Sequence, residues 1–100
     1  YTIKMEELIV FLCKSRKLLE AREMLLFSLK KDQSIDIDIC SSVITDLCKI
    51  CKVSEAFGLY YELLEKKIQP VNCLEDLRIA LEAEGRTKES EFVAKRMLKA

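Results

Sequence analysis

The sequence predicts an all-α fold, a solenoid of about three helix-turn-helix repeats. A signature recurs at a fixed offset, because Leu12-Cys13-Lys14 with Glu20-Ala21 returns 35 positions later as Leu47-Cys48-Lys49 with Glu55-Ala56. A weaker third copy lies 34 positions after the second, with Leu81 in the place of Leu47. A period of roughly 20 to 50 residues is typical of stacked repeats. The chain also has only 2 glycines and 1 proline, which favours helices with short connections over strands.

The first unit contains two stretches with apolar residues at helical spacing, over residues 2–13 and from residue 18 to about residue 31. The two stripes are Met5, Leu8, Ile9 and Leu12, and then Leu18, Ala21, Met24, Leu25 and Leu29. A polar turn at residues 15–17 separates the two expected helices. Asp32-Gln33-Ser34 ends the pattern.

The second unit repeats this plan. Its stripes are Cys40, Val43, Ile44 and Leu47, and then Ala56, Leu59, Tyr60, Leu63 and Leu64. Asp36 or Asp38 can cap the free amide groups of the first helix, and Ser54 stands where the N-cap of the second belongs. Pro70 ends the connection to the third unit.

The third unit is one residue shorter and starts near Asn72. Its stripes are Leu74, Leu77 and Leu81, and then Phe92, Val93 and Met97, with Gly85-Arg86 as the turn and Thr87 as the expected cap. Arg78 takes the place of Ile9 and Ile44, which is what a terminal, solvent-facing repeat needs. We therefore expect three helical hairpins, the last being a cap or the end of a longer array. Leu12 and Leu47 are expected in equivalent buried sites between hairpins.

The composition argues against several functions. Lys plus Arg and Asp plus Glu both number 17, so no bulk charge attracts nucleic acid or an anionic membrane, and such binding would need a local patch. No apolar run approaches the ~18 residues of a membrane span. The chain has no His, no glycine-rich phosphate loop and no assembled nucleophile and base, so no enzyme, cofactor or small-molecule substrate is expected. It starts at Tyr1 without Met, so we expect a fragment or a processed product, from which a targeting peptide could have been lost.

The cysteines favour a reducing compartment, because 5 of them occur without framework spacing. Cys48-x-x-Cys51 is a weak suggestion of a metal or redox site. A zinc site needs about four ligands, and a thioredoxin-like motif needs a βαβ context. Cys13 and Cys48 hold the same repeat position, which favours a packing role. No metal site is predicted.

The quoted motifs resemble the pentatricopeptide repeat family. Its 35-residue units run through a leucine-cysteine-lysine segment, a glutamate-alanine pair and an isoleucine-x-proline ending, which here is Ile68-Gln69-Pro70. The match divides the single domain 1–100 into repeats at approximately 2–36, 37–71 and 72–100. The tetratricopeptide alternative has a 34-residue period and a tryptophan-containing pattern, which this Trp-free chain lacks. Uniform 35-residue units resemble the plain class, without appended editing or nuclease domains.

The resemblance implies a right-handed superhelix of paired antiparallel helices, an organellar location, and one RNA base read per repeat by the fifth and last residues. By that register the RNA-binding residues are Glu6 and Asp36 in the first repeat, Ser41 and Val71 in the second, and Glu75 or Asp76 at the fifth place of the third. The family commonly pairs asparagine, serine or threonine with a final asparagine or aspartate. Asp36 and Ser41 each supply half of such a pair, and no repeat supplies both.

The RNA-facing surface implied by the family is expected to be acidic. It would collect Glu6, Asp36, Asp38, Glu75 or Asp76, and Glu82, against only Lys14 and Lys49 as candidate phosphate contacts. The aromatic residues Phe57, Tyr60, Tyr61 and Phe92 fall on second helices, where core packing is expected over base stacking. We therefore expect weak base reading.

Two function classes remain open. In one, the chain binds single-stranded RNA in organellar transcript processing, stability or translation, in the mitochondrion or alternatively the plastid. In the other, it is an architectural module docked by ribosomal or other organellar proteins. Lys31 and Lys66 are 35 positions apart at the ends of second helices and could form a phosphate or partner edge, although cations are also favoured there by the helix dipole.

Overall fold

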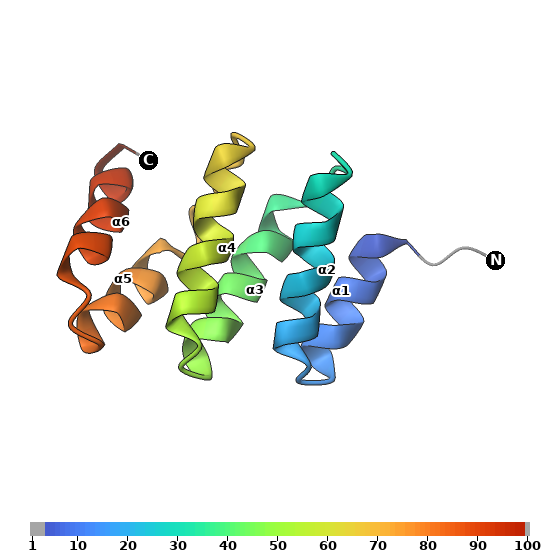
Figure 1. Ribbon diagram of the computed structural model, residues 1–100, viewed down its shortest axis with the longest axis horizontal. Helices are drawn as coiled ribbons and strands as arrows, with labels where there is room; N and C mark the ends of the chain where they lie inside the picture. Colours follow the sequence, from blue (N-terminus) through green and yellow to red (C-terminus); the bar gives the residue numbers. More distant parts are fainter. Residues whose placement is uncertain (1–3, 100) are drawn as a thin grey trace.

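The structure is a row of three helical hairpins (Figure 1). It is a computed structural model that describes the backbone of residues 4–99 and the side chains of residues 4–98. The helices are α1 (Met5–Lys14), α2 (Leu18–Lys30), α3 (Ile37–Lys49), α4 (Val53–Glu65), α5 (Leu74–Ala83) and α6 (Thr87–Lys99). The row measures 46 × 26 × 18 Å. The all-α prediction is confirmed, and each expected repeat contains one helix pair.

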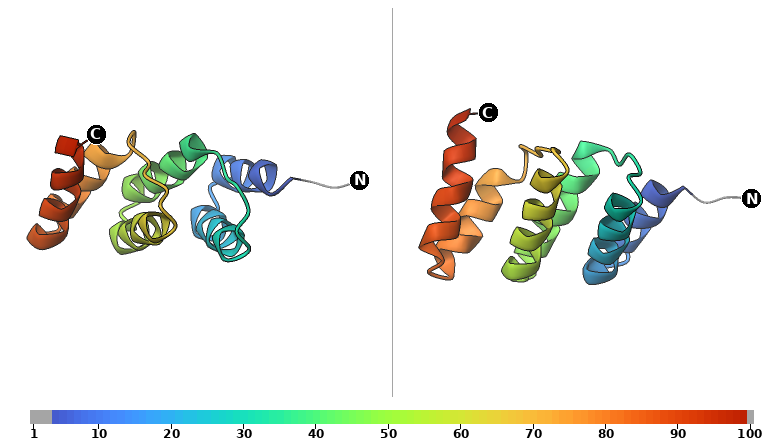
Figure 2. Two further views of the ribbon diagram at one scale, coloured as in Figure 1. Left: turned by 90° about the horizontal axis from the view of Figure 1, so that it is seen from above. Right: turned by 45° about the horizontal axis from the view of Figure 1, so that its top comes forward.

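The helices form two layers (Figure 2). One layer contains α1, α3 and α5, and its outer surface is called the odd-helix face. The other contains α2, α4 and α6, and its outer surface is called the even-helix face. Each helix packs on its hairpin partner, and each hairpin packs on the next through pairs such as α1 with α3 and α3 with α5. The core therefore runs without interruption along the row.

Every connection contains one residue in the left-handed backbone region. Within the hairpins these residues are Arg16 (φ 65°), Cys51 (φ 61°) and Gly85 (φ 71°). The amide of the next residue then donates to a carbonyl five positions back, as Lys17 does to Leu12 at 2.8 Å. Asp32 (φ 54°) and Lys67 (φ 62°) close the ends of α2 and α4 in the same way. This is the Schellman arrangement, and it satisfies carbonyl groups that a helix end leaves open.

The capping predictions have mixed outcomes. Asp36 caps α3, because its carboxylate accepts from the Asp38 amide at 2.7 Å. Ser54 is not an N-cap: α4 begins one residue earlier, and the Ser54 hydroxyl accepts instead from Arg86 of the third hairpin at 2.6 Å. Thr87 is the first residue of α6, so it lies inside the helix that it was expected to precede. The first helix was expected from residue 2, but it begins at Met5, and residues 2–3 lie outside the described part.

The apolar stripes form the core, but not equally in all three hairpins. Leu47 and Leu81 are 0% exposed, whereas Leu12 at the same repeat position is partly exposed. The expectation that Leu12 and Leu47 are equally buried is therefore wrong. The reason is geometric: α3 packs against α1 and α2, and α5 packs against α3 and α4, whereas no described helix precedes α1.

We expect the two leucines to differ in their contribution to stability. Leu47→Ala should lower the free energy of unfolding by ~2 to 5 kcal/mol, because it leaves a cavity in a closed core. Leu12→Ala should cost about half as much or less, because water already reaches that side chain. Urea denaturation of both variants measures the difference. Equal losses of unfolding free energy in the two variants would contradict the exposure of Leu12 in this structure.

The left-handed turn residues give a second stability prediction. Cys51→Gly should raise the free energy of unfolding by up to about 1 kcal/mol, because glycine adopts a positive φ without the steric cost of a Cβ atom. Gly85→Ala should lower it by about 1 kcal/mol. A Cβ atom at Gly85 would meet nothing within 4 Å, so that loss would report backbone strain alone. A destabilised Cys51→Gly variant would contradict the turn geometry.

Candidate nucleic-acid interface

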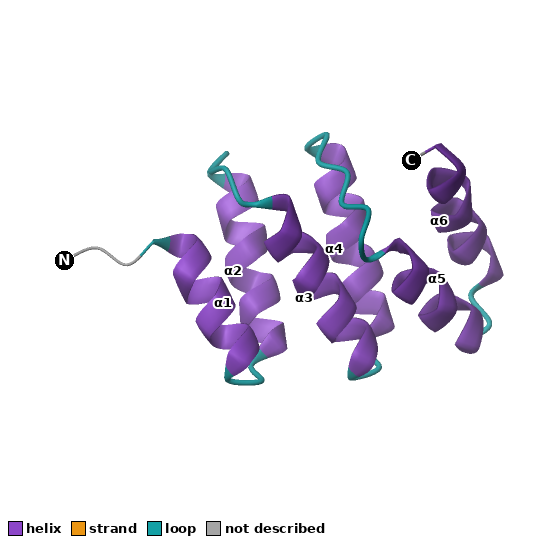
Figure 3. Ribbon diagram, turned by 180° about the vertical axis from the view of Figure 1, so that it is seen from behind, coloured by secondary structure: helices purple, strands orange, loops and turns teal. Residues whose placement is uncertain are grey.

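Charge is segregated along the helices of the odd-helix face, α1, α3 and α5, which lie in front in Figure 3. The first turns carry the acidic residues Glu6, Glu7, Asp38, Glu75 and Asp76. The last turns of α1 and α3 carry Lys14 and Lys49. All three helices run in the same direction, so their acidic ends form one rim, and Lys14 and Lys49 lie at the opposite, basic rim, where the last turn of α5 has no basic residue. The face is therefore divided into two charged rims.

The structure brings Glu6 and Asp36 together. The Asp36 amide donates to Glu6 Oε2 at 2.6 Å, and the Asp36 carboxylate is held by the Asp38 amide. Both side chains thus accept hydrogen bonds from backbone amides at the start of α3. The predicted reading pair of the first repeat is therefore adjacent, and one oxygen of each carboxylate accepts a hydrogen bond within the protein.

Ser41 and Val71 have different environments. Ser41 is 5% exposed, and it lies near the buried Cys73 thiol. Val71 is 52% exposed, in the connection between α4 and α5. In the third repeat Glu75 and Asp76 are exposed, and Glu75 pairs with Arg78. Ser41 therefore exposes little of its hydroxyl at the surface.

Arg78 changes the charge balance that the sequence suggested for this face. Its guanidinium contacts Glu75 and Glu82, and those hydrogen bonds hold the pKa of Arg78 above its usual value. Glu82 is therefore a paired carboxylate instead of a free negative charge. The sequence argument interpreted Arg78 as the mark of a terminal, solvent-facing repeat and missed this neutralisation.

A groove runs between α1 and α3 on the odd-helix face. One part, of about 390 Å³, is lined by Val10, Cys13, Lys14, Arg16, Asp38, Ile39, Ser42 and Asp46. The adjoining part, of about 400 Å³, shares Val10, Lys14 and Ile39 and adds Glu6, Glu7 and Phe11. Lys14 therefore lines both parts of the groove, beside the apolar side chains of Val10 and Ile39. The groove is large enough to hold a few units of a linear polymer.

Three further cations lie at the basic rim and were not singled out from the sequence. Arg16 lies in the first hairpin turn, and Lys17 and Lys52 are the N-cap residues of α2 and α4. All three are exposed, and none contacts a carboxylate of the described residues within 4.0 Å. Lys17 and Lys52 are 35 positions apart, so the repeat register could have identified them from the sequence as equivalent cations.

Lys31 and Lys66 lie at equivalent points on the opposite edge, as the C-cap residues of α2 and α4. The Lys66 ammonium pairs with Asp32 Oδ1 at 3.0 Å. The Lys31 ammonium lies 5.6 Å from the centre of the Phe27 ring. Both side chains therefore have partners within the chain, which reduces the charge they offer to an outside group.

The cysteines fall into buried and exposed groups. Cys40 and Cys73 are 0% exposed, and burial raises the pKa of each to about 11. Burial also raises the pKa of Cys48 to about 12. Cys51 is exposed in its turn. Within residues 4–99 no group of three His, Cys, Asp or Glu side chains is placed to hold a metal ion.

The aromatic residues of the second helices pack at the junction of hairpins two and three. Tyr60 is 1% exposed, and the Phe57 and Phe92 rings meet edge to face at 5.8 Å. Core packing is thus confirmed for these three. Tyr61 is 46% exposed, so the same expectation is wrong for it. No described helix has the length and apolar character needed to cross a membrane.

Comparison with known proteins decides the family. Over 98 residues, or 97% of its length, the chain is 52% identical to a pentatricopeptide repeat-containing protein of Arabidopsis thaliana whose name carries the label chloroplastic. The chain belongs to the pentatricopeptide repeat family. It spans 14% of the length of that relative. No protein-family model matches the chain.

The pentatricopeptide chain should show unequal thiol reactivity. Only the thiolate attacks a disulfide reagent, so a raised pKa lowers the reactive fraction at any pH below it. At pH 8, Cys51 should react first with Ellman's reagent, and Cys40, Cys48 and Cys73 should react slowly in the folded chain. Cys51→Ser should remove the fast phase. A fast phase that persists in this variant would show that another thiol is accessible to the reagent.

Proposed function

We propose that the chain is an RNA-binding segment of a protein of organellar RNA metabolism, acting in transcript processing, stability or translation. Pentatricopeptide proteins are in general RNA-associated adaptors without catalytic activity, and the chain has no His to supply acid-base chemistry. The observation that carries the proposal is the row of exposed cations at the basic rim, Lys14 and Lys17 in the first hairpin and Lys49 and Lys52 in the second.

The row fits a phosphate backbone because its members repeat with the hairpins. Each hairpin places one lysine at the end of its first helix and one at the start of its second. A strand that follows the row meets a pair of cations at each repeat and stays away from the acidic rim. Releasing counterions from the strand then contributes to the binding free energy.

Base reading in these repeats is proposed to be weak. One oxygen of the Glu6 carboxylate and one of the Asp36 carboxylate accept from backbone amides, and Ser41 is buried. Val71 offers only an apolar surface. Contacts to phosphate position a strand without selecting its sequence, so binding should depend little on the bases.

The compartment is proposed to be the plastid. The mitochondrion was our first expectation from the sequence, with the plastid as the alternative. The label chloroplastic in the name of the Arabidopsis relative favours the alternative. Import of a fusion of the full-length protein into isolated chloroplasts and mitochondria distinguishes the two.

An architectural role is the second candidate, and an observation favours it. Phe11 is 63% exposed beside the groove between α1 and α3, and Ile79 on α5 is 51% exposed. Apolar side chains of this size on a charged face are suited to a protein partner. In that case Lys31 and Lys66 would contact acidic groups of the partner.

The RNA proposal predicts a specific salt dependence. The double variant Lys17→Ala, Lys52→Ala should bind single-stranded RNA more weakly than the unaltered chain. The slope of log affinity against log salt should fall by about 1.4, at about 0.7 per lost phosphate contact. Fluorescence anisotropy titrations between about 50 and 200 mM salt measure this slope.

The control removes two lysines from the even helices, Lys30→Ala with Lys95→Ala, which changes the net charge equally. It should leave the slope nearly unchanged. The pair Lys31→Ala, Lys66→Ala tests the opposite edge in the same titration. If the rim and control variants lose the same slope, net charge and not the rim governs binding, and the proposed path is wrong.

A further inference from the structure

A groove of about 500 Å³ lies between α2 and α4 on the even-helix face, and both helices lie in front in Figure 1. Arg22, Leu26, Phe27 and Lys30 line it from α2, and Gly58 and Glu62 line it from α4. The lysines of the basic rim do not belong to this lining. The groove is therefore separate from the proposed RNA path.

Gly58 leaves the groove open. It lies inside α4 and its φ is not positive, so the backbone does not require a glycine there. Glycine also makes a helix interior less stable than alanine does. Within 4 Å, and outside its own helix, a Cβ atom would meet only the end of the flexible Arg22 side chain, at 3.3 Å. What the glycine provides is therefore space above α4.

The equivalent place at the next junction is filled by an aromatic ring. Phe92 of α6 takes the repeat position of Gly58, 34 residues later. Its ring meets Phe57 edge to face at 5.8 Å and lies 6.1 Å from the Tyr61 ring. Arg96 stacks on the other side chain of this contact, 3.7 Å from the centre of the Phe92 ring. An aromatic side chain thus packs between the even helices at this junction.

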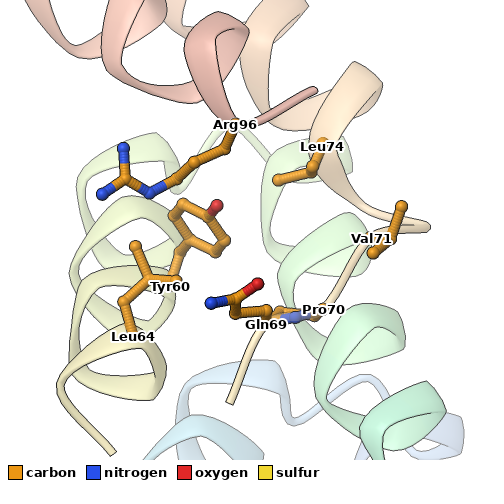
Figure 4. Close-up of a pocket in the computed structure, with 7 residues that line it drawn as sticks. All are labelled: Tyr60, Leu64, Gln69, Pro70, Val71, Leu74 and Arg96. Carbon is orange, nitrogen blue, oxygen red and sulfur yellow. The ribbon is translucent and has the colours of Figure 1, made fainter. Parts of the chain in front are cut away.

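Phe92 and Arg96 cover α4 at the second junction. Arg96 extends from α6 toward Tyr60 of α4, which is 1% exposed (Figure 4). The cavity that remains beside Tyr60 measures about 200 Å³. At the first junction the repeat positions of Phe92 and Arg96 are Gly58 and Glu62, which supply neither a ring nor a cation. The first junction therefore lacks the cover that the second has.

The walls of the open groove suit a ring from outside the chain. Phe27 is 46% exposed, and Leu26 beside it is partly exposed. The Arg22 guanidinium lies next to Gly58 and is fixed there, because its Nε donates to the Glu55 carbonyl at 2.9 Å. Arginine stacks favourably on aromatic faces, and the neighbouring junction already contains such a pair. The groove thus offers apolar contacts and a positioned cation.

The charges of the groove favour an acidic partner sequence. The lining contains three cations and two carboxylates, which leaves one net positive charge. Lys30, at the end of α2, contacts no carboxylate of the described residues within 4.0 Å. Complementary charge beside an apolar anchor adds specificity to a protein contact. Acidic residues next to the inserted ring are therefore favoured over basic ones.

We infer that this groove binds a protein partner by accepting one aromatic side chain, flanked by acidic residues, into the place that Phe92 fills at the next junction. The ring rests on Gly58, between Leu26, Phe27 and the Arg22 guanidinium. This interaction surface is additional to the proposed RNA function and does not depend on it. A nucleobase fits less well, because the rim lysines lie at the opposite ends of α2 and α4 from this lining's lysines.

The first test titrates peptide probes into the ¹⁵N-labelled chain. The probe is an acetylated, amidated pentapeptide with one phenylalanine between two pairs of aspartates. It should shift the amide signals of Gly58 and Phe27, and the same peptide with alanine in place of phenylalanine should not. A version with lysines in place of the aspartates should bind about threefold more weakly or worse. No shift with the first peptide, or equal shifts with the alanine peptide, would overturn the inference.

The second test uses matched variants. Gly58→Phe fills the groove from within and should abolish the peptide-induced shift at Phe27. Leu26→Ala removes part of a wall and should weaken peptide binding about three- to tenfold. Leu19→Ala changes the same residue type on the same helix, at an exposed position outside the lining, and should have no effect. Circular dichroism checks the fold of Gly58→Phe, and the two leucine variants decide the question if that variant does not fold. Equal binding by Leu26→Ala and Leu19→Ala would contradict the groove.

Two further measurements identify other occupants. Light scattering shows whether the chain forms a dimer that Gly58→Phe converts to a monomer, which would make a second copy the occupant and overturn the inference. A uridine oligonucleotide should bind Gly58→Phe and the unaltered chain equally, because the rim lysines are unchanged. A loss of RNA affinity in this variant would assign the groove to RNA instead of protein. If neither chain binds RNA while the peptide binds, the groove stands and the RNA function is wrong.

Discussion

Reversal of the chain within two or three residues is the constraint on which this structure depends. The C-terminal ends of α1 to α5 are each closed by one left-handed residue and by an amide that donates to the carbonyl five positions back. In the hairpin turns the accepting carbonyls belong to Leu12, Leu47 and Leu81, which are also members of the apolar stripes. One leucine thus fixes the turn with its backbone and the packing with its side chain. The recurrence of leucine at this position follows from this double role.

Contacts between hairpins then set how the units stack. Ala21 and Ala56 are 0% exposed, and such small side chains let helices approach closely. Polar bonds add to this contact: Arg22 donates to the Glu55 carbonyl at 2.9 Å, and Arg86 donates to Ser54. Both arginines are partly buried, so these bonds also satisfy groups that would otherwise lose water. The stack is therefore held by side chains that belong to different repeats.

The sequence predicts the helix pairs because their signals are local. Apolar spacing and the repeat offset both lie within one unit and its copy. Ser54 was assigned to a cap because its position fits one, but its partner Arg86 lies 32 residues away and no local rule finds it. The burial of Ser41 and the exposure of Leu12 likewise depend on the neighbouring hairpin. The edge-to-face contact of Phe57 with Phe92 joins α4 to α6, and no spacing rule in one repeat describes it.

The lysines of the basic rim have two physical explanations, stabilisation by the helix dipole and contact with an anion outside the fold. Which explanation applies depends on the position of the lysine in its helix. Lys14 and Lys49 lie in last helical turns, where the helix dipole stabilises a cation by ~0.3 to 1 kcal/mol. Their recurrence can therefore reflect stability alone. Lys17 and Lys52 are N-cap residues, where the same dipole disfavours a cation. Their recurrence has no benefit for the helices that they begin, so an anion outside the fold is the better explanation for this second pair.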